Sequence, residues 1–113
     1  MKHCVLASYD LVPSPKGAAQ HIISNVSNLK GTYDVSLVTL GDVPLYGYRH
    51  YPLDLKIPNW LSRGKEFHDR CMAIFQKNDF DIYHVRSPWE GLAVPPNKTL
   101  IYEVNGLASI EMP

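Results

Sequence analysis

Short apolar runs along the chain predict five strands. His3–Ser8 shows no alternation of apolar and polar residues, which is typical of a strand covered on both faces. Val35–Leu40 is rich in β-branched residues and ends before a Gly-Asp pair, and strands are also expected over Asp81–Val85 and Thr99–Val104. Arg49–Leu53 contains a proline, which cannot donate to a β-ladder, so this strand is expected at an edge of the sheet.

Apolar residues at helical spacing predict two helices between these strands. From Ala19 to Leu29 they form one stripe, and Gly31 is expected to end the helix. After Pro58 a second stripe predicts the longest helix, of about 18 residues. A short helix is expected to start after Pro88. The second stripe consists of Trp60, Phe67, Cys71, Ile74 and Phe75.

The alternation of strands and helices predicts an α/β, Rossmann-like fold. Right-handed crossovers between parallel strands place helices on both faces of a sheet of about five strands, most simply in the order 3-2-1-4-5. The chain of 113 residues is long enough for one domain with one core. Ala108–Met112 resembles the opening of a further helix that stops at Pro113, so we expect residues 1–113 to be a truncated part of their domain.

Composition and charge argue against several classes of function. The 11 basic and 11 acidic residues cancel and are scattered, which leaves no basic surface for nucleic acid. The first apolar run is too short for a signal peptide, and no segment approaches the roughly 20 apolar residues of a membrane span. Cys4 and Cys71 are far apart in sequence and are expected to be buried, reduced thiols. Reduced cysteines favour a cytoplasmic location.

The carboxyl ends of the predicted strands are where a ligand site is expected. In an open parallel sheet, ligands bind beyond these ends, at the point where the strand order reverses. This rule selects three loops, Pro13–Gly17, Arg86–Gly91 and Asn105–Glu111. Lys16 and Gly17 lie at a helix start, where backbone N–H groups and the helix dipole favour a phosphate; a tight turn at the glycine is the structural alternative.

Polar residues at the ends of the last two strands are candidates for contacts with a substrate. His84 and Arg86 are two residues apart and point to the same side, and Arg86 could reach a carboxylate, a phosphate or a sugar hydroxyl. A hydrogen-bonded core role is the commoner one for a histidine such as His84. The Asn105 amide could bind a sugar hydroxyl, although Asn-Gly is also a common turn. Glu103 and Glu111 do not define an acid/base pair by their spacing.

Trp89 has two alternative roles. It could stack on a sugar ring, or it could pack beneath its own loop, which is the commoner arrangement. The five histidines show no metal-ligand spacing, so no metal is expected. No residue can be assigned as catalytic from the sequence.

The order of these segments resembles the amino-terminal domain of the group 1, or family 4, retaining glycosyltransferases of the GT-B fold. The resemblance rests on the initial strand followed by Pro15–Ala18 and an apolar helix, and then on Tyr33–Thr39, Phe80–Arg86 and Leu100–Leu107. It runs over essentially the whole chain. Many relatives have a histidine where this chain has Asn105, so a catalytic role is not carried over to that side chain.

The resemblance implies transfer of a sugar from a nucleoside-diphosphate sugar to an acceptor hydroxyl, with retention and without a metal or other cofactor. Two Rossmann-like domains would face a cleft, with a carbohydrate or lipid-linked acceptor held by the amino-terminal domain and the donor by a carboxyl-terminal domain absent from this chain. Lys16 and Gly17 would approach the donor diphosphate, while the loops after His84 and Asn105 would shape the acceptor pocket. The isolated chain is expected to be inactive, and membrane association of the whole enzyme stays open.

Without the resemblance, the same alternation fits a small flavodoxin-like or receiver-like module that binds a phosphorylated ligand or a partner protein. A receiver would need a cluster of acidic residues after the first strand, where Asp10 stands alone. A flavin site would need a loop rich in Ser and Thr. A third hypothesis is an interaction domain whose uncovered apolar face causes self-association.

Overall fold

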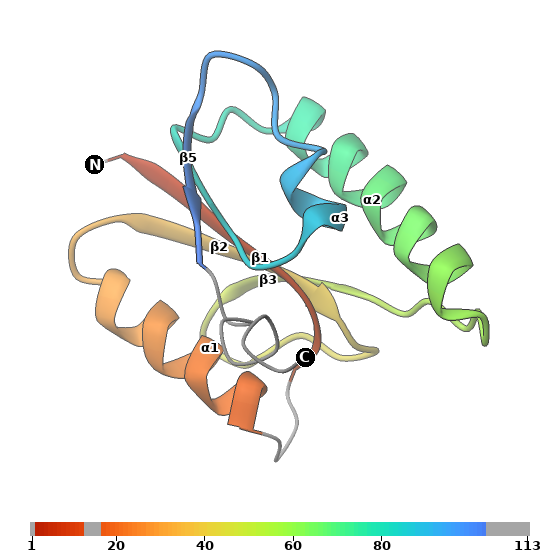
Figure 1. Ribbon diagram of the computed structural model, residues 1–113. Helices are drawn as coiled ribbons and strands as arrows, with labels where there is room; N and C mark the ends of the chain where they lie inside the picture. The colour runs from red at the N-terminus through yellow and green to blue at the C-terminus, as the bar shows by residue number, and fades with distance from the viewer. Residues whose placement is uncertain (1, 13–16, 104–113) are drawn as a thin grey trace, which may run out of the picture.

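Five parallel strands form one sheet with helices on both faces (Figure 1). The computed structural model describes residues 2–12 and 17–103 of the chain. In chain order the elements are β1 (His3–Leu11), α1 (Gly17–Leu29), β2 (Asp34–Leu40), β3 (Arg49–Leu53), α2 (Trp60–Lys77), β4 (Ile82–Val85), α3 (Pro88–Gly91) and β5 (Thr99–Tyr102). The strands lie in the order β3-β2-β1-β4-β5, which confirms the predicted Rossmann-like topology. The strand order therefore reverses between β1 and β4, and all carboxyl ends meet at one edge of the sheet.

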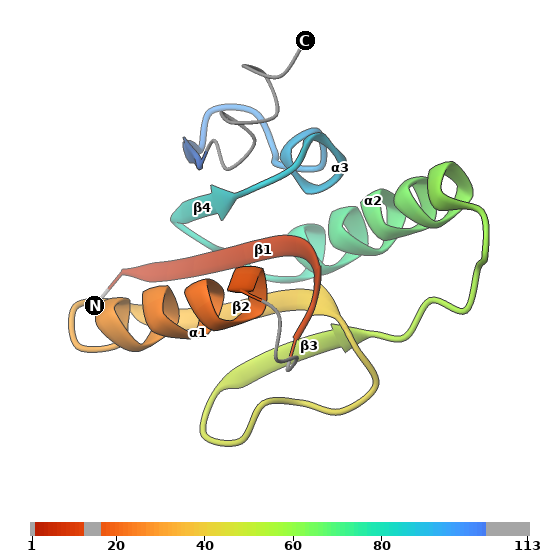
Figure 2. The ribbon, with the colours of Figure 1, turned by 60° about the horizontal axis from the view of Figure 1, so that its bottom comes forward.

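The two long helices cover opposite faces of the sheet, so the core has two halves (Figure 1, Figure 2). In β1, Cys4 and Leu6 pack on the α1 side, whereas Val5 and Ala7 pack on the α2 side. All four side chains are buried, which explains why the first apolar run shows no alternation. The helices contribute Ile22 and Val26 from α1, and Phe67, Cys71 and Phe75 from α2.

The first strand is longer than predicted, because β1 continues past Ser8 to Leu11. Its register against β2 shifts between Ala7 and Leu11, and Leu11 then pairs with Leu40. Ser8 is fully buried and its hydroxyl donates to Asp10, so this polar residue is satisfied inside the sheet. The extension places Tyr9 and Asp10 at the carboxyl-terminal end of the strand.

The two edges of the sheet differ in character. β3 lies at one edge, as its proline predicted, with Pro52 opposite Thr39 of β2. β5 forms the other edge, and its apolar side chains Leu100, Ile101 and Tyr102 are about half exposed. Apolar side chains are therefore exposed along β5, with Leu100 and Tyr102 on one face of the strand and Ile101 on the other, and a role in self-association stays a prediction.

The remaining predicted boundaries agree closely with the structure. α1 ends just before Gly31, β4 begins at Ile82, and the expected short helix is α3. The last strand ends at Tyr102, earlier than predicted, and Val104 lies outside the described residues. The expected helix over Ala108–Met112 lies outside the described residues. Within residues 2–12 and 17–103, no helix combines the length and the apolar character that a membrane span requires.

Both cysteines are buried and free, as predicted. Burial raises the pKa of the Cys4 thiol to about 11. It also raises the pKa of Cys71, with a further increase from the nearby Glu90 carboxylate. Both therefore behave as small apolar core residues at neutral pH.

Candidate functional site

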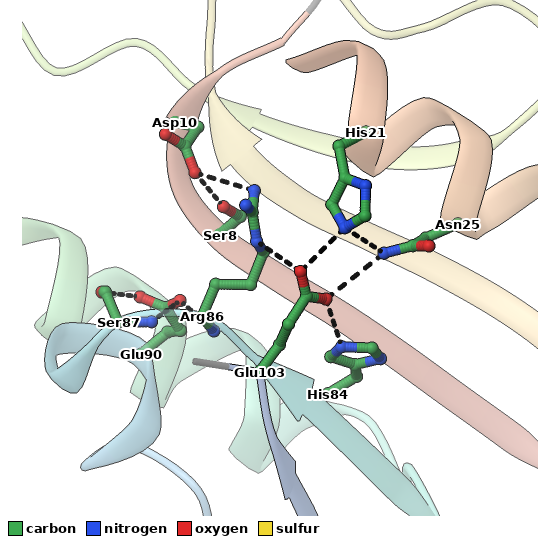
Figure 3. Close-up of polar contacts among 9 residues, drawn as sticks. All are labelled: Ser8, Asp10, His21, Asn25, His84, Arg86, Ser87, Glu90 and Glu103. Atoms are coloured by element: carbon green, nitrogen blue, oxygen red, sulfur yellow. Dashed lines mark hydrogen bonds and ion pairs between the residues drawn. The ribbon is translucent and has the colours of Figure 1, made fainter. Parts of the chain in front are cut away.

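Charged side chains from four elements converge at the carboxyl edge of the sheet (Figure 3). Asp10 comes from β1, His84 from β4 and His21 from α1, while Arg86 and Glu103 directly follow the strand ends of β4 and β5. This is the edge that the strand-order rule selects, and the cluster spans the reversal point between β1 and β4.

Arg86 is the buried cation at the centre of this cluster. Its side chain is only 5% exposed, and its Nη1 donates to Asp10 Oδ2 at 3.2 Å. Its Nε lies 3.5 Å from Glu103 Oε2 and makes no hydrogen bond with any described residue. The guanidinium thus links carboxylates from both neighbouring strands. Its positive charge lies against two carboxylates of the protein, and a contact between Arg86 and a substrate stays a prediction.

Glu103 ties β4, β5 and α1 together. Its carboxylate lies 2.9 Å from Nε2 of both His21 and His84, and it accepts from Asn25 Nδ2 at 3.2 Å. Burial alone would raise the pKa of Glu103, but the hydrogen bonds from His84 and His21 and the charge of Arg86 hold it below its ordinary value. An ionised carboxylate can only accept, so each imidazole donates through its Nε2–H.

Asp10 lies beside this network and is more accessible. Its Oδ2 atom accepts both from Arg86 and from the hydroxyl of buried Ser8. The Asp10 side chain is 37% exposed, against 5% for Arg86. The arrangement orients the Asp10 carboxylate while leaving it within reach of a ligand.

Glu90 shapes the loop after β4 from inside. Its fully buried carboxylate accepts from the backbone N–H groups of Arg86 and Ser87 at 2.9 and 2.8 Å, and from the Ser87 hydroxyl. The contact with the Ser87 backbone N–H is part of a capping box at the start of α3. Burial raises the pKa of Glu90, although the hydrogen bonds from Ser87 and Arg86 act in the opposite direction. Glu90 is therefore a structural residue that fixes the backbone around Arg86.

An aromatic pocket of about 530 Å³ opens next to Asp10. Trp60 and Trp89 form an edge-to-face pair with ring centroids 5.7 Å apart, and Tyr9 meets both rings edge-on at 6.2 and 6.4 Å. Trp89 also packs against Gly64 of α2, so it has the predicted packing role and lines the pocket as well. The complete lining consists of Tyr9, Asp10, Trp60, Arg86, Ser87, Pro88, Trp89 and Leu92.

The predicted site residues fall into three groups. His84 and Arg86 lie in the charged cluster, and His84 has the hydrogen-bonded role that was the commoner alternative. Gly17 is the first residue of α1. An added β-carbon at this position would meet nothing within 4 Å, so there is space for a larger residue there. Lys16 and Asn105 lie outside the described residues.

Several residues of the site were not found from the sequence. Tyr9 and Asp10 were placed beyond the end of the first strand, although Ser8 and Asp10 have the two-residue spacing of neighbours on one face. His21 and Asn25 have the four-residue spacing of neighbours on a helix, which could have marked them as a pair. Trp60 was grouped with the apolar stripe of α2, yet it is 56% exposed.

Comparisons with protein-family models and with curated protein sequences find no match for this chain. Across the part of the chain that the structure describes, no group of three or more His, Cys, Asp or Glu side chains is arranged to hold a metal ion. The functional argument therefore depends on the geometry of the cluster and the aromatic pocket.

Proposed function

We propose that this chain is the acceptor-side part of the amino-terminal domain of a glycosyltransferase, which moves a sugar from a nucleoside-diphosphate sugar to an acceptor hydroxyl with retention. The observation that supports this best is the pocket of about 530 Å³ beside Asp10, at the reversal point between β1 and β4. Its size suits a small-molecule ligand, and it combines aromatic walls with a carboxylate that can accept from hydroxyl groups.

The residues of the cluster have distinct roles in this proposal. Asp10 accepts a hydrogen bond from the acceptor sugar, and Arg86 holds Asp10 in position. Glu103 fixes the relative positions of β4, β5 and α1 through His84 and His21. We assign no catalytic residue among them.

Transfer itself requires the second domain of such an enzyme. The carboxyl-terminal domain would hold the donor, and Lys16 and Gly17 would approach the donor diphosphate across the cleft. Stabilisation of the leaving diphosphate needs charges on both sides of a closed cleft from which water is excluded. We therefore expect the 113-residue chain alone to bind acceptors without transferring sugar.

A backbone amide NMR titration of the 113-residue chain tests this proposal. Methyl glycosides of common hexoses should shift the amides of Asp10 and Arg86 in a saturable way. Asp10→Asn should weaken binding about tenfold, because a hydroxyl donates a stronger hydrogen bond to an ionised carboxylate than to a neutral amide oxygen. Asp42→Asn is the matched control, since this exposed aspartate follows β2 and does not line the pocket.

Two results would overturn the proposal. The first is that flavin mononucleotide or a divalent cation shifts the amides of Asp10 and Arg86 while no glycoside does. The chain would then be a flavodoxin-like or receiver-like module. Equal weakening by Asp10→Asn and Asp42→Asn would show that glycosides do not contact the Asp10 carboxylate.

A further inference from the structure

We infer that the aromatic pocket takes a neutral pyranoside, with the apolar C–H face of the sugar on Trp60 and a sugar hydroxyl on the Asp10 carboxylate. The inference rests on the proposed function and specifies its acceptor: an uncharged, hydroxyl-rich sugar held by ring stacking. Trp60 is then the residue that determines specificity, and Asp10 sets the orientation of the ring.

The aromatic rings leave a surface on which a sugar can lie. Tyr9, Trp60 and Trp89 meet one another edge to face, with interplanar angles of 67°, 61° and 71°, so they are not stacked face on face. Trp60 is 56% exposed, which is unusual for the largest apolar side chain. Figure 2 shows why: the first turn of α2, where Trp60 lies, extends beyond the ends of the strands.

Trp89 forms the fixed wall of the pocket. Its ring fills the space above Gly64, where any β-carbon would lie 2.4 Å from Trp89 Cε2. His68 Nδ1 lies 2.9 Å from the Trp89 carbonyl oxygen, and the capping box of Glu90 holds the same turn. Because Trp89 is held in place beside the exposed ring of Trp60, the pocket is preorganised for a ligand.

The charges around the pocket favour an uncharged ligand. Among the described lining residues the cation is Arg86, which is 5% exposed and lies between the Asp10 and Glu103 carboxylates. Arg63 on α2 donates to the Tyr9 hydroxyl and does not line the pocket. As far as the described residues go, a phosphate or carboxylate would therefore lie against Asp10 without an available cation, whereas a sugar hydroxyl can donate to it.

Tryptophan fluorescence reports on this pocket directly, because both tryptophans of the chain line it. Methyl hexopyranosides should give a saturable change in the emission of the 113-residue chain, while inorganic phosphate and the 6-phosphates of the same hexoses should not. Trp60→Ala should raise the Kd about tenfold or more, and Trp60→Phe should restore part of the affinity. Tyr46→Ala is the control, since this side chain is 98% exposed and lies outside the pocket.

The outcomes separate this inference from the proposed function. If glycosides shift the Asp10 amide but do not change the tryptophan emission, and Trp60→Ala leaves the Kd unchanged, the stacking inference is wrong and the proposed function stands. Where the phosphorylated sugars bind and the neutral ones do not, the inferred substrate class is wrong. Where no saccharide changes either the amide shifts or the emission, both fail. Circular dichroism of Trp60→Ala and Trp60→Phe confirms that each variant is folded before these results are compared.

Discussion

Gly64 and Trp89 pack so closely that no β-carbon fits between them: one added at Gly64 would lie 2.4 Å from Trp89 Cε2 and 2.6 Å from Cζ2. Gly64 lies inside α2, where a glycine costs about 0.5–1 kcal/mol relative to alanine. Helix propensity alone would therefore favour alanine over glycine at position 64. The contact with Trp89 explains the glycine, because this wall of the aromatic pocket requires the space.

Gly64→Ala should therefore destabilise the protein, although alanine is the better helix former. We expect a loss of about 1–3 kcal/mol in the free energy of unfolding, measured by urea denaturation, because the indole must move. The tryptophan emission should change as Trp89 is displaced. Ser24→Ala in α1 is the control, since it is exposed and should be neutral or slightly stabilising. Stabilisation by Gly64→Ala would contradict the packing argument.

Glu103→Gln should loosen the connection between α1, β4 and β5. The glutamine amide has one acceptor oxygen, whereas the carboxylate accepts from His21, His84 and Asn25. The change also removes a charge beside buried Arg86. We expect thermal unfolding to report a loss of about 2–4 kcal/mol, because a buried charge loses one of its partners.

A surface carboxylate provides the control for this change. Glu66 pairs with Arg70 one turn later on the exposed side of α2. Glu66→Gln should cost no more than about 0.5 kcal/mol, as is usual for such pairs. Equal effects of Glu66→Gln and Glu103→Gln would mean that the contacts of Glu103 contribute no more than an ordinary surface pair.

The two cysteines should be unreactive in the folded protein. Burial raises the pKa of Cys4 to about 11, so almost none of this thiol is thiolate at pH 8, and Cys71 is fully buried. A thiol reagent should therefore label neither residue until urea unfolds the chain, and it should then label both. Rapid labelling of Cys71 under native conditions would show that α2 opens locally, because this thiol faces the core.

The sheet could be predicted from the sequence because its signals are local. The apolar runs fixed which segments become strands, Pro52 placed β3 at an edge, and right-handed crossovers left few possible strand orders. The end of β1 was missed for a physical reason. Ser8 looked like the end of an apolar strand, but the structure satisfies it through the Asp10 side chain.

The site was only partly predictable because its contacts are long-range. Arg86 and His84 were found from their position at a strand end, but their partner Glu103 was recognised only as an isolated carboxylate. The sequence assigned no role to His21, because its contact with Glu103 exists only once the fold brings the end of β5 beside α1. Trp60 fitted the apolar stripe of α2, and nothing local shows that the first turn of the helix extends past the sheet.

His50 gives the fold a dependence on pH. Burial lowers its pKa from 6.5 to about 4. Its Nδ1 accepts from the Leu45 backbone N–H at 2.8 Å, so the neutral ring carries its proton on Nε2, which lies 2.7 Å from Thr39 Oγ1. Between pH 6.5 and about 4 the unfolded chain binds a proton that the folded protein does not. The free energy of unfolding should therefore fall as the pH is lowered through this window, by at most about 1.4 kcal/mol per pH unit.

His50→Gln isolates this contribution, because glutamine keeps one donor and one acceptor but does not titrate. The variant should be less stable than the parent protein at pH 7, and the difference in the free energy of unfolding should shrink as the pH falls to 4. Taking this difference also removes the opposite dependence of Glu90, whose raised pKa favours the folded state on acidification. Urea denaturation at pH 7, 6, 5 and 4 provides the measurement. A difference that stays constant across these pH values would show that His50 titrates alike in the folded and unfolded chain, and the buried neutral ring would then be the wrong description.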